Sequence, residues 1–270
     1  MAQSYRLSAP PCAAYGALMD MLPPAILLAC LAVTLLAGVI KGAVGFAMPL
    51  VMVSGIGMLL DPQTTVAAII LPIVATNLVQ TFRTGMGPAI EAARAHWRYL
   101  ALVSLAILGF GQLLPRVDTR TFSLILGIPT AILSAVQLAG WHPHIPPGRE
   151  RAAEVIAGLL SGALGGLAGT WGPTTVLYLL ALNVPKRKSV IVQGVIYGTG
   201  SLALLAAHLL SGVLSARTAP LSALLLVPAL VGIWIGMKVQ DRLDAVRFRR
   251  WTLVVLAVAG LNLIRKGLMG

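Results

Sequence analysis

Two stretches of the sequence, GVIKGAVGFAMP at residues 38–49 and GALGGLAGTWGP at residues 162–173, share a spaced pattern of glycines that ends in proline. Four residues of the first stretch recur 124 positions later in the second: Gly38, Gly42, Gly45 and Pro49 match Gly162, Gly166, Gly169 and Pro173. Self-similarity at a fixed spacing indicates an internal repeat. The chain is therefore predicted to consist of two related halves, each with a glycine-rich turn.

The residues around these stretches are mostly apolar. Of the 270 residues, 58% are hydrophobic and 10% are charged, whereas soluble domains carry about a quarter of charged residues. The stretches 22–40 and 66–82 contain no charged residue at all, and about 20 such residues are enough for a helix to span a bilayer. We therefore expect an all-α polytopic membrane protein and not a soluble domain.

Apolar runs bounded by charges, prolines or glycine clusters define the predicted segments of the two halves. The second and seventh runs are shorter than the roughly 20 residues of a crossing helix, so we expect glycine-rich broken helices or re-entrant hairpins there. Five segments fall in each half, which predicts a tail (1–21), a first repeat (22–140), a linker (141–153) and a second repeat (154–266). The ten segments are 22–40, 46–60, 66–82, 99–115, 121–139, 154–169, 173–184, 190–210, 221–238 and 251–264.

The distribution of basic residues predicts the orientation in the membrane. An odd number of segments in each half inverts the second repeat relative to the first. When alternate loops are assigned to opposite sides, most of the 20 Lys and Arg residues fall on one side. Basic loops favour the cytoplasm, so the linker 141–153 is predicted to be cytoplasmic and both termini, including the tail 1–21, extracytoplasmic.

Each glycine-rich stretch is predicted to be a turn that leads into a half-helix. Glycine allows close approach of the backbone, and proline fits the first turn of a helix. The free N–H groups and the positive dipole end at such a helix start can hold an anion. Gly42, Gly45, Gly166 and Gly169 are therefore candidate binding residues. For any single glycine, close packing between helices is an equally good explanation, because small residues four positions apart favour it.

Polar residues near the turns complete the candidate site. Lys41 lies within the first turn, where a charge at membrane depth needs an anion or water, but it is an ordinary interfacial lysine if the first segment crosses completely. The segments that follow the turns carry polar residues on one helical face, which either bond neighbouring helices or line a pathway. The predicted substrate-binding residues are Lys41, Gly42, Gly45, Asn77, Gly166, Gly169, Thr170, Trp171, Thr174, Gln193 and Tyr197.

Other classes of function are disfavoured. The basic residues behind the net charge of +12 stand singly or in short clusters between apolar segments, so they report topology and not nucleic-acid binding. The two cysteines are too few for a zinc site or a disulfide framework. His142 and His144 lack metal-site spacing, and His208 with Ser211 lacks an orienting acid. We expect no catalytic residue, metal or cofactor, and hence no enzyme.

The two glycine-rich motifs, the small and polar run 67–77 and the basic residues 186–188 together resemble the TauE/SafE family of sulfite exporters over residues 22–265. The resemblance implies two related halves that carry small anions, such as sulfite, sulfonates or other organosulfur anions, across the bacterial inner membrane.

The expected function is thus a secondary transporter, an exporter of small anions that works by alternating access around the two turns. Two alternatives stay open: a non-transporting membrane assembly subunit, whose glycines only pack helices, and a carrier of non-sulfur carboxylates. Expected partners are a small anionic substrate and the lipid bilayer, with no nucleic acid. A homo-oligomer is compatible with the sequence.

Overall fold

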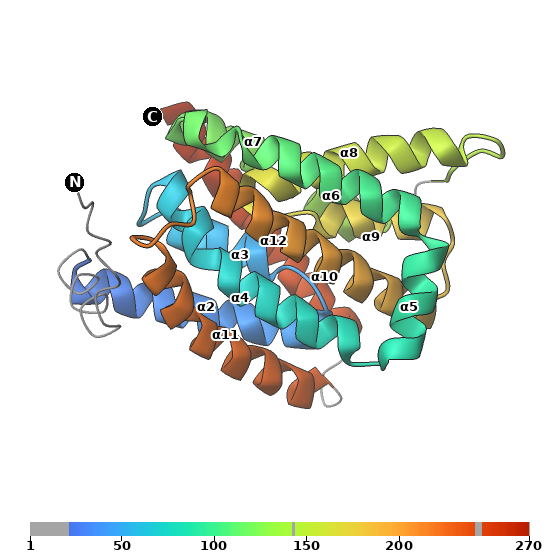
Figure 1. Cartoon of the computed structure of the whole chain (residues 1–270), viewed down its shortest axis with the longest axis horizontal. Coiled ribbons are helices and arrows are strands. Elements are labelled where there is room, and N and C mark those ends of the chain that lie inside the picture. The colour runs from blue at the N-terminus through green and yellow to red at the C-terminus, as the bar shows by residue number, and fades with distance from the viewer. Residues whose placement is uncertain (1–21, 142–143, 241–244, 270) are drawn as a thin grey trace, which may run out of the picture.

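The computed structural model describes residues 22–141, 144–240 and 245–269, and its helices form one bundle (Figure 1). No strand occurs in the described residues. The tail predicted at 1–21 and the candidate His142 lie outside them. The helices are α2 (Pro24–Val44), α3 (Met48–Ile56), α4 (Pro62–Phe82), α5 (Met86–Ala95), α6 (Trp97–Gly111), the short 3-10 helix η1 (Leu114–Arg116), α7 (Thr119–Leu138), α8 (Glu150–Ala168), α9 (Gly172–Ala181), α10 (Lys186–Leu210), α11 (Ala219–Gln240) and α12 (Ala245–Met269).

Eight helical segments in the described part of the chain are long and apolar enough to cross a membrane: α2, α4, α6 continued through η1, α7, α8, α10, α11 and α12. At 1.5 Å per residue, each is about 30 Å long, which matches the hydrocarbon core of a bilayer. Large apolar side chains such as Leu28, Leu105 and Leu210 point outward and are more than half exposed. The prediction of an all-α polytopic membrane protein is confirmed.

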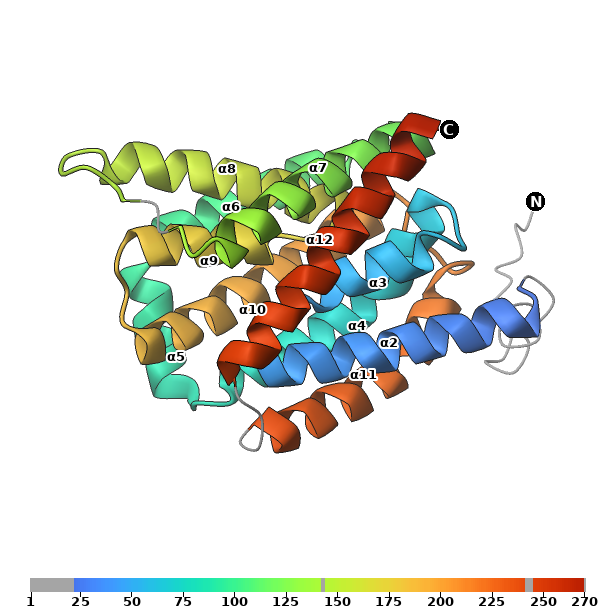
Figure 2. The same cartoon turned by 180° about the vertical axis from the view of Figure 1, so that it is seen from behind.

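The two helices that follow the glycine-rich turns are too short to cross. α3 has nine residues and α9 has ten, which corresponds to about 13 to 15 Å, or half of the hydrocarbon core. As Figure 2 shows, α3 turns back and ends at the end of the bundle where α2 begins, and α9 returns in the same way along α8. The short second and seventh segments are therefore half-length helices that form hairpins with the helix before them.

Helix α5 is absent from the predicted segments. Residues 83–98 are predicted to be a loop because of their charges, and this prediction is wrong for α5. The charged Glu91 and Arg94 are exposed, whereas Ala89 and Ala92, three residues apart on the opposite face, are buried. This face packs against α10. A one-sided surface helix of this kind has no continuous apolar run by which a membrane segment could be recognised.

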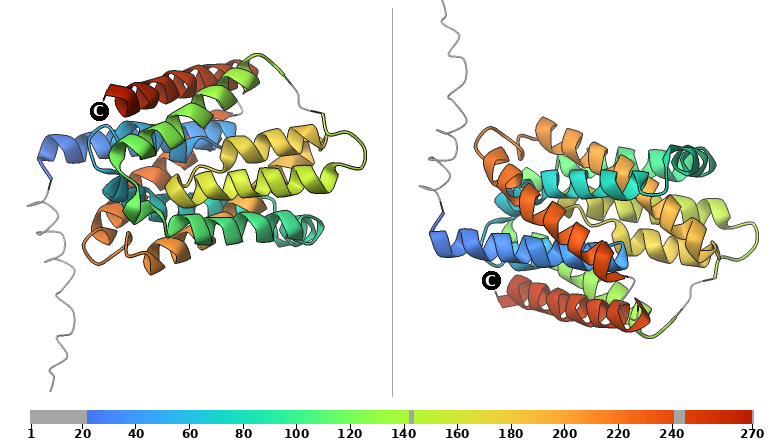
Figure 3. Two further views of the ribbon diagram at one scale, coloured as in Figure 1. Left: turned by 90° about the horizontal axis from the view of Figure 1, so that it is seen from above. Right: turned by 90° about the horizontal axis from the view of Figure 1, so that it is seen from below.

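The most extensive helix contacts join the two halves of the sequence. α2 packs against α11, α6 against α8, and α7 against α12, with the α7–α12 pair lying along one side of the bundle (Figure 3). A Cβ atom added at Gly42 would lie 2.8 Å from the Cα of Gly236, and one added at Gly166 would lie 2.7 Å from the amide nitrogen of Gly111. The backbones of α2 and α11, and of α6 and α8, are therefore in direct contact, as small residues permit in membranes.

The structure extends the correspondence between the halves beyond the glycine motif. α2 and α8 each end at a glycine in the left-handed conformation, Gly45 (φ 88°) and Gly169 (φ 67°), and α3 and α9 begin three residues later. The N-cap residues of α4 and α10, Asp61 and Pro185, are also 124 positions apart. Thus the end of α2, the start of α3 and the start of α4 each recur 124 positions later in the second half.

The ends of the helices alternate along the bundle. α2 starts and α12 finishes at one end, whereas α8 starts at the opposite end (Figures 1 and 2). The inverted two-fold relation of the repeats, their boundaries, and the end that faces the cytoplasm stay predictions.

Candidate functional site

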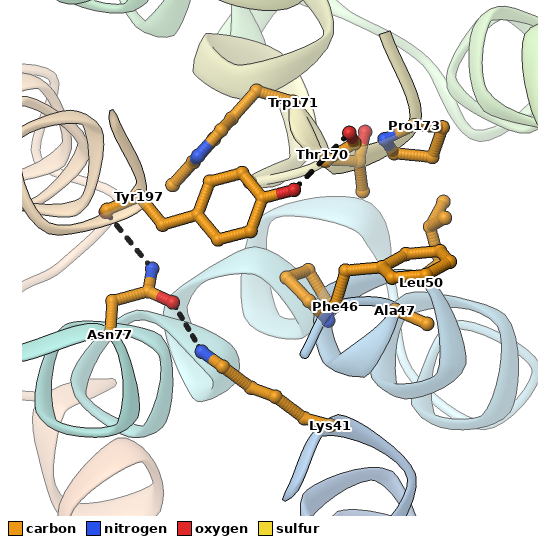
Figure 4. Close-up of a pocket in the computed structure, with 12 residues that line it drawn as sticks. Lys41, Phe46, Ala47, Leu50, Asn77, Thr170, Trp171, Pro173 and Tyr197 are labelled. Carbon is orange, nitrogen blue, oxygen red and sulfur yellow. Dashed lines mark hydrogen bonds between the residues drawn. The ribbon is translucent and has the colours of Figure 1, made fainter. Parts of the chain in front are cut away.

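A cavity lies between the turn that joins α2 to α3 and the turn that joins α8 to α9, with α4 and α10 beside it (Figure 4). Half of the lining residues come from each half of the chain. They are Lys41, Phe46, Ala47, Pro49, Leu50 and Asn77 from the first half, and Gly169, Thr170, Trp171, Gly172, Pro173 and Tyr197 from the second. Residues more than 100 positions apart thus meet around one space.

The first turn contains two residues with a positive φ, Gly45 and Ala47. The amide of Gly45 donates to the carbonyl of Lys41 at 2.7 Å and closes α2. Ala47 also has a positive φ of 79°, so the chain reverses within three residues, and Pro49 then occupies the first turn of α3. The side-chain amide of Gln80 in α4 donates to the carbonyl of Gly45 at 2.9 Å. This bond fixes the turn against α4.

The second turn also begins at a glycine with a positive φ, but Trp171, at the position that corresponds to Ala47, has a φ of −85°. The amide of Gly169 donates to the carbonyl of Gly165 at 2.6 Å, and the Thr170 hydroxyl donates to the carbonyl of Leu164 at 3.2 Å. α9 then begins with Pro173 in its first turn. The first N–H groups of any helix lack partners within the helix and carry the positive end of its dipole. Since both helix starts line the cavity, both dipoles contribute positive potential there.

Lys41 brings a basic side chain to the cavity. It lies in the last turn of α2 and not in the turn that follows, which corrects the predicted position. Its side chain is 3% exposed, a value that argues against the alternative of an interfacial lysine. The ammonium group donates to the hydroxyl of Thr76 at 2.9 Å and to the side-chain oxygen of Asn77. Both acceptors are neutral and belong to α4.

Asn77 connects the lysine to the other half of the chain. Its side-chain nitrogen donates to the backbone carbonyl of Tyr197 in α10 at 3.1 Å, and the Tyr197 hydroxyl donates to the carbonyl of Gly172 at 3.3 Å. Figure 4 shows this sequence of groups along one wall of the cavity. The polar face predicted on α4 and α10 therefore lies at the site, at least at these two positions.

Six of the predicted binding residues line the cavity: Lys41, Asn77, Gly169, Thr170, Trp171 and Tyr197. Five do not. Gly42 and Gly166 lie within the helices, at the contacts with α11 and α6. Gly45 shapes the first turn, the Thr174 hydroxyl donates to the carbonyl of Trp171 at 2.9 Å, and the Gln193 side chain donates to Ser189 at 3.0 Å. For Gly42 and Gly166 the structure agrees with the packing alternative.

Pro49 and Pro173 are parts of the repeated motif, but the sequence predicts substrate binding for none of the other lining residues, namely Phe46, Ala47, Pro49, Leu50, Gly172 and Pro173. Apolar side chains in an apolar segment carry no signal of their own. Their position directly after the glycine that ends α2 or α8 is the feature that could have identified them.

The cavity is small and has no acidic group. Its volume is about 20 Å³, enough for about one water molecule. The lining residues in the described part of the chain include no Asp or Glu, and no group of three or more His, Cys, Asp or Glu residues in that part could hold a metal ion. The electrostatic character of the site therefore comes from Lys41 and the two helix starts.

Comparisons with known proteins identify the family. A search of curated proteins and a search of solved structures each found no match. The sequence profile described as sulfite exporter TauE/SafE, however, matches residues 30–263. This match covers both turns and every residue that lines the cavity. The chain therefore belongs to the TauE/SafE sulfite exporter family, and with its eight long apolar helices it is a multi-pass membrane transporter.

Proposed function

We propose that the protein is a secondary carrier that exports small anions, such as sulfite, sulfonates or other organosulfur anions, by alternating access around the two turns. We place it in the bacterial inner membrane with both termini outside. The observation that carries the proposal is the ammonium group of Lys41, which is buried in a cavity between two helix N-termini.

The buried lysine favours an anionic ligand. Thr76 and Asn77 satisfy two of its donors but carry no charge, and no carboxylate lines the cavity among the described residues. A buried charge without an opposite charge is costly in a low-dielectric environment. A bound anion would supply the opposite charge, and the first N–H groups of α3 and α9 would supply further donors. This arrangement is the one expected of an anion site inside a membrane.

The packing of the helices supports alternating access. α2, α3 and α4 pack together with α11, whereas α8, α9 and α10 pack together with α6. The cavity lies between these two groups. With room for about one water molecule, it is too small for a sulfonate in this conformation, so a sulfonate can bind there only if the groups separate. The α4–α10 crossing joins them, where the hydroxyl of Thr81 donates to the carbonyl of Gly194 at 2.7 Å.

The membrane potential is the proposed driving force, because no carboxylate is available at the cavity to carry a coupling proton. A monovalent anion that leaves an inside-negative cell gains about 2.3 kcal/mol per 100 mV, which supports a gradient of about fiftyfold at 25 °C. We expect purified protein in proteoliposomes to move sulfite or benzenesulfonate when valinomycin sets a potassium diffusion potential at fixed pH without sodium. The direction of flux should reverse with the sign of the potential.

Matched controls make the flux experiment decisive. Lys41→Met should abolish flux, whereas Lys238→Met, which changes an exposed lysine on α11, should not. Flux of benzoate but not of benzenesulfonate would favour the carboxylate carrier. The absence of any flux from folded protein would refute the proposal in favour of the assembly subunit, and flux that depends strictly on a proton or sodium gradient would refute the proposed driving force.

A further inference from the structure

The indole ring of Trp171 occupies a slot formed by two glycines. A Cβ atom added at Gly165 of α8 would lie 2.9 Å from Cε3 of the ring, and one added at Gly200 of α10 would lie 3.2 Å from Cε2. Neither position could carry a larger side chain without displacing the ring. Trp171 is 2% exposed and lines the cavity, so the slot holds its ring at the site.

The corresponding positions of the first half have the opposite distribution of side chains. With the offset of 124 residues, Gly165 corresponds to Lys41, Trp171 to Ala47, and Gly200 to Thr76. In the first half the turn residue is small, and the space is filled from α2 by the Lys41 side chain, which Thr76 holds by a hydrogen bond. In the second half the turn residue is large, and both helix positions are glycine. Positions related by the 124-residue offset therefore present a lysine on one side and an aromatic ring on the other.

These two groups lie on opposite sides of the cavity. In Figure 4 the ammonium group of Lys41 and the ring of Trp171 lie on opposite sides of the ring of Tyr197, and all three residues line the cavity. Around Lys41 the wall is polar because of Asn77. Elsewhere the wall includes the apolar side chains of Phe46 and Leu50, and the hydroxyls of Thr170 and Tyr197 donate to backbone carbonyls. The site thus has a lysine on one side and an aromatic ring with apolar neighbours on the other.

We propose that this asymmetry selects an organic anion with one acidic head and an apolar body over an inorganic oxyanion, and that Trp171 is the residue that determines this specificity. The inference rests on the proposed anion transport. The head lies at Lys41 and the start of α3, and the apolar body lies against the ring of Trp171. An inorganic anion places polar oxygen atoms against this ring and loses hydrogen bonds to water without replacement. A hydrocarbon body instead gains from burial against the apolar wall.

Binding measurements on the purified full chain in nanodiscs test the inference. Methane-, ethane- and propanesulfonate share one charge and one head group and differ only in their apolar bodies. We expect wild-type affinity to rise about fourfold per added methylene, the equivalent of about 0.8 kcal/mol, and sulfite to bind more weakly than propanesulfonate. Trp171→Ala should reduce this dependence on chain length, with Trp171→Phe intermediate. Lys41→Met should weaken all three sulfonates by a similar factor.

Trp234→Ala is the matched control, because Trp234 is 54% exposed and lies outside the cavity. It should keep the wild-type dependence on chain length. Wild-type protein that binds sulfite at least as tightly as propanesulfonate would overturn the inference, and so would an unchanged chain-length dependence in folded Trp171→Ala. If this variant does not fold, the wild-type series decides alone. In these cases anion transport itself stands, whereas binding of none of these anions, together with no flux, would refute the proposed function as well.

Discussion

Replacement of Gly42 by alanine tests whether this glycine packs helices or serves the anion. The added Cβ would collide with the carbonyl oxygen of Ile233 and lie 2.8 Å from the Cα of Gly236, whereas ordinary contacts begin at 3.4 Å. α2 and α11 would therefore have to separate by at least about 0.6 Å. Both obstructing groups belong to the backbone of α11, so rotation of a side chain cannot relieve the clash.

The expected cost of this overpacking is about 1–3 kcal/mol, reduced by up to about 1 kcal/mol because alanine favours the helix more than glycine does. Gly109→Ala in α6 is the matched control. A Cβ there would meet nothing within 4 Å, so this variant gains helix propensity without a clash. The difference in stability between the two variants thus isolates the contact between α2 and α11.

Thermal unfolding of the two purified variants, followed by tryptophan fluorescence, measures this difference. Gly42→Ala should unfold at a lower temperature than wild type and Gly109→Ala at the same or a higher temperature. Below its unfolding transition, Gly42→Ala should bind sulfonates nearly as tightly as wild type. Equal stability of the two variants would refute the tight contact. A loss of anion affinity without a loss of stability would make Gly42 a binding residue.

Four further predictions concern the site and the orientation. Lys41→Met should weaken sulfonate binding by about 10- to 100-fold, as expected for a hydrogen bond to a charged group worth about 1.5–3 kcal/mol. Lys41→Arg should keep part of the wild-type affinity. Equal affinities of the three proteins in titration calorimetry would contradict the role of the charge. Gly169→Leu should abolish flux in proteoliposomes, because φ is 67° there and its Cβ would lie 2.9 Å from the side chain of Ile73; wild-type flux in this variant would refute the assigned turn. Burial raises the pKa of Asp61, but hydrogen bonds from Thr64 and the backbone outweigh this effect and leave the pKa below its usual value. Asp61→Ala should therefore lower the stability of the protein by about 1 kcal/mol at neutral pH, and the difference from wild type should vanish as acid protonates the carboxylate. A difference in stability that persists in acid would show that the Asp61 carboxylate does not cap α4. The cysteine of Lys188→Cys should resist impermeant thiol reagents in whole cells, because the basic residues 186–188 place this end of α10 on the predicted cytoplasmic side. Ready labelling of this cysteine would show that the orientation is opposite to the predicted one.

The sequence by itself was sufficient for the membrane character, most of the helices and the two turns. Each long helix needs its own uninterrupted apolar residues, because its backbone hydrogen bonds are local and its surface faces lipid. The turns could be located for the same reason: Gly45 and Gly169 end their helices through their own backbone conformation, which depends on neighbouring residues alone. Helix α5 escaped prediction because its packing, mainly against α10, cannot be recognised from the local sequence.

The tertiary structure alone decided what each glycine and polar residue contacts. Gly42 and Gly45 belong to one motif, yet the first packs against α11 and the second shapes the turn, and no spacing in the sequence separates these roles. Likewise, Lys41 meets Thr76 from a helix that begins 21 residues later, and the slot for Trp171 combines residues of α8 and α10. Sequence periodicity specifies the face of a helix but not its partner, which depends on how all the helices pack at once.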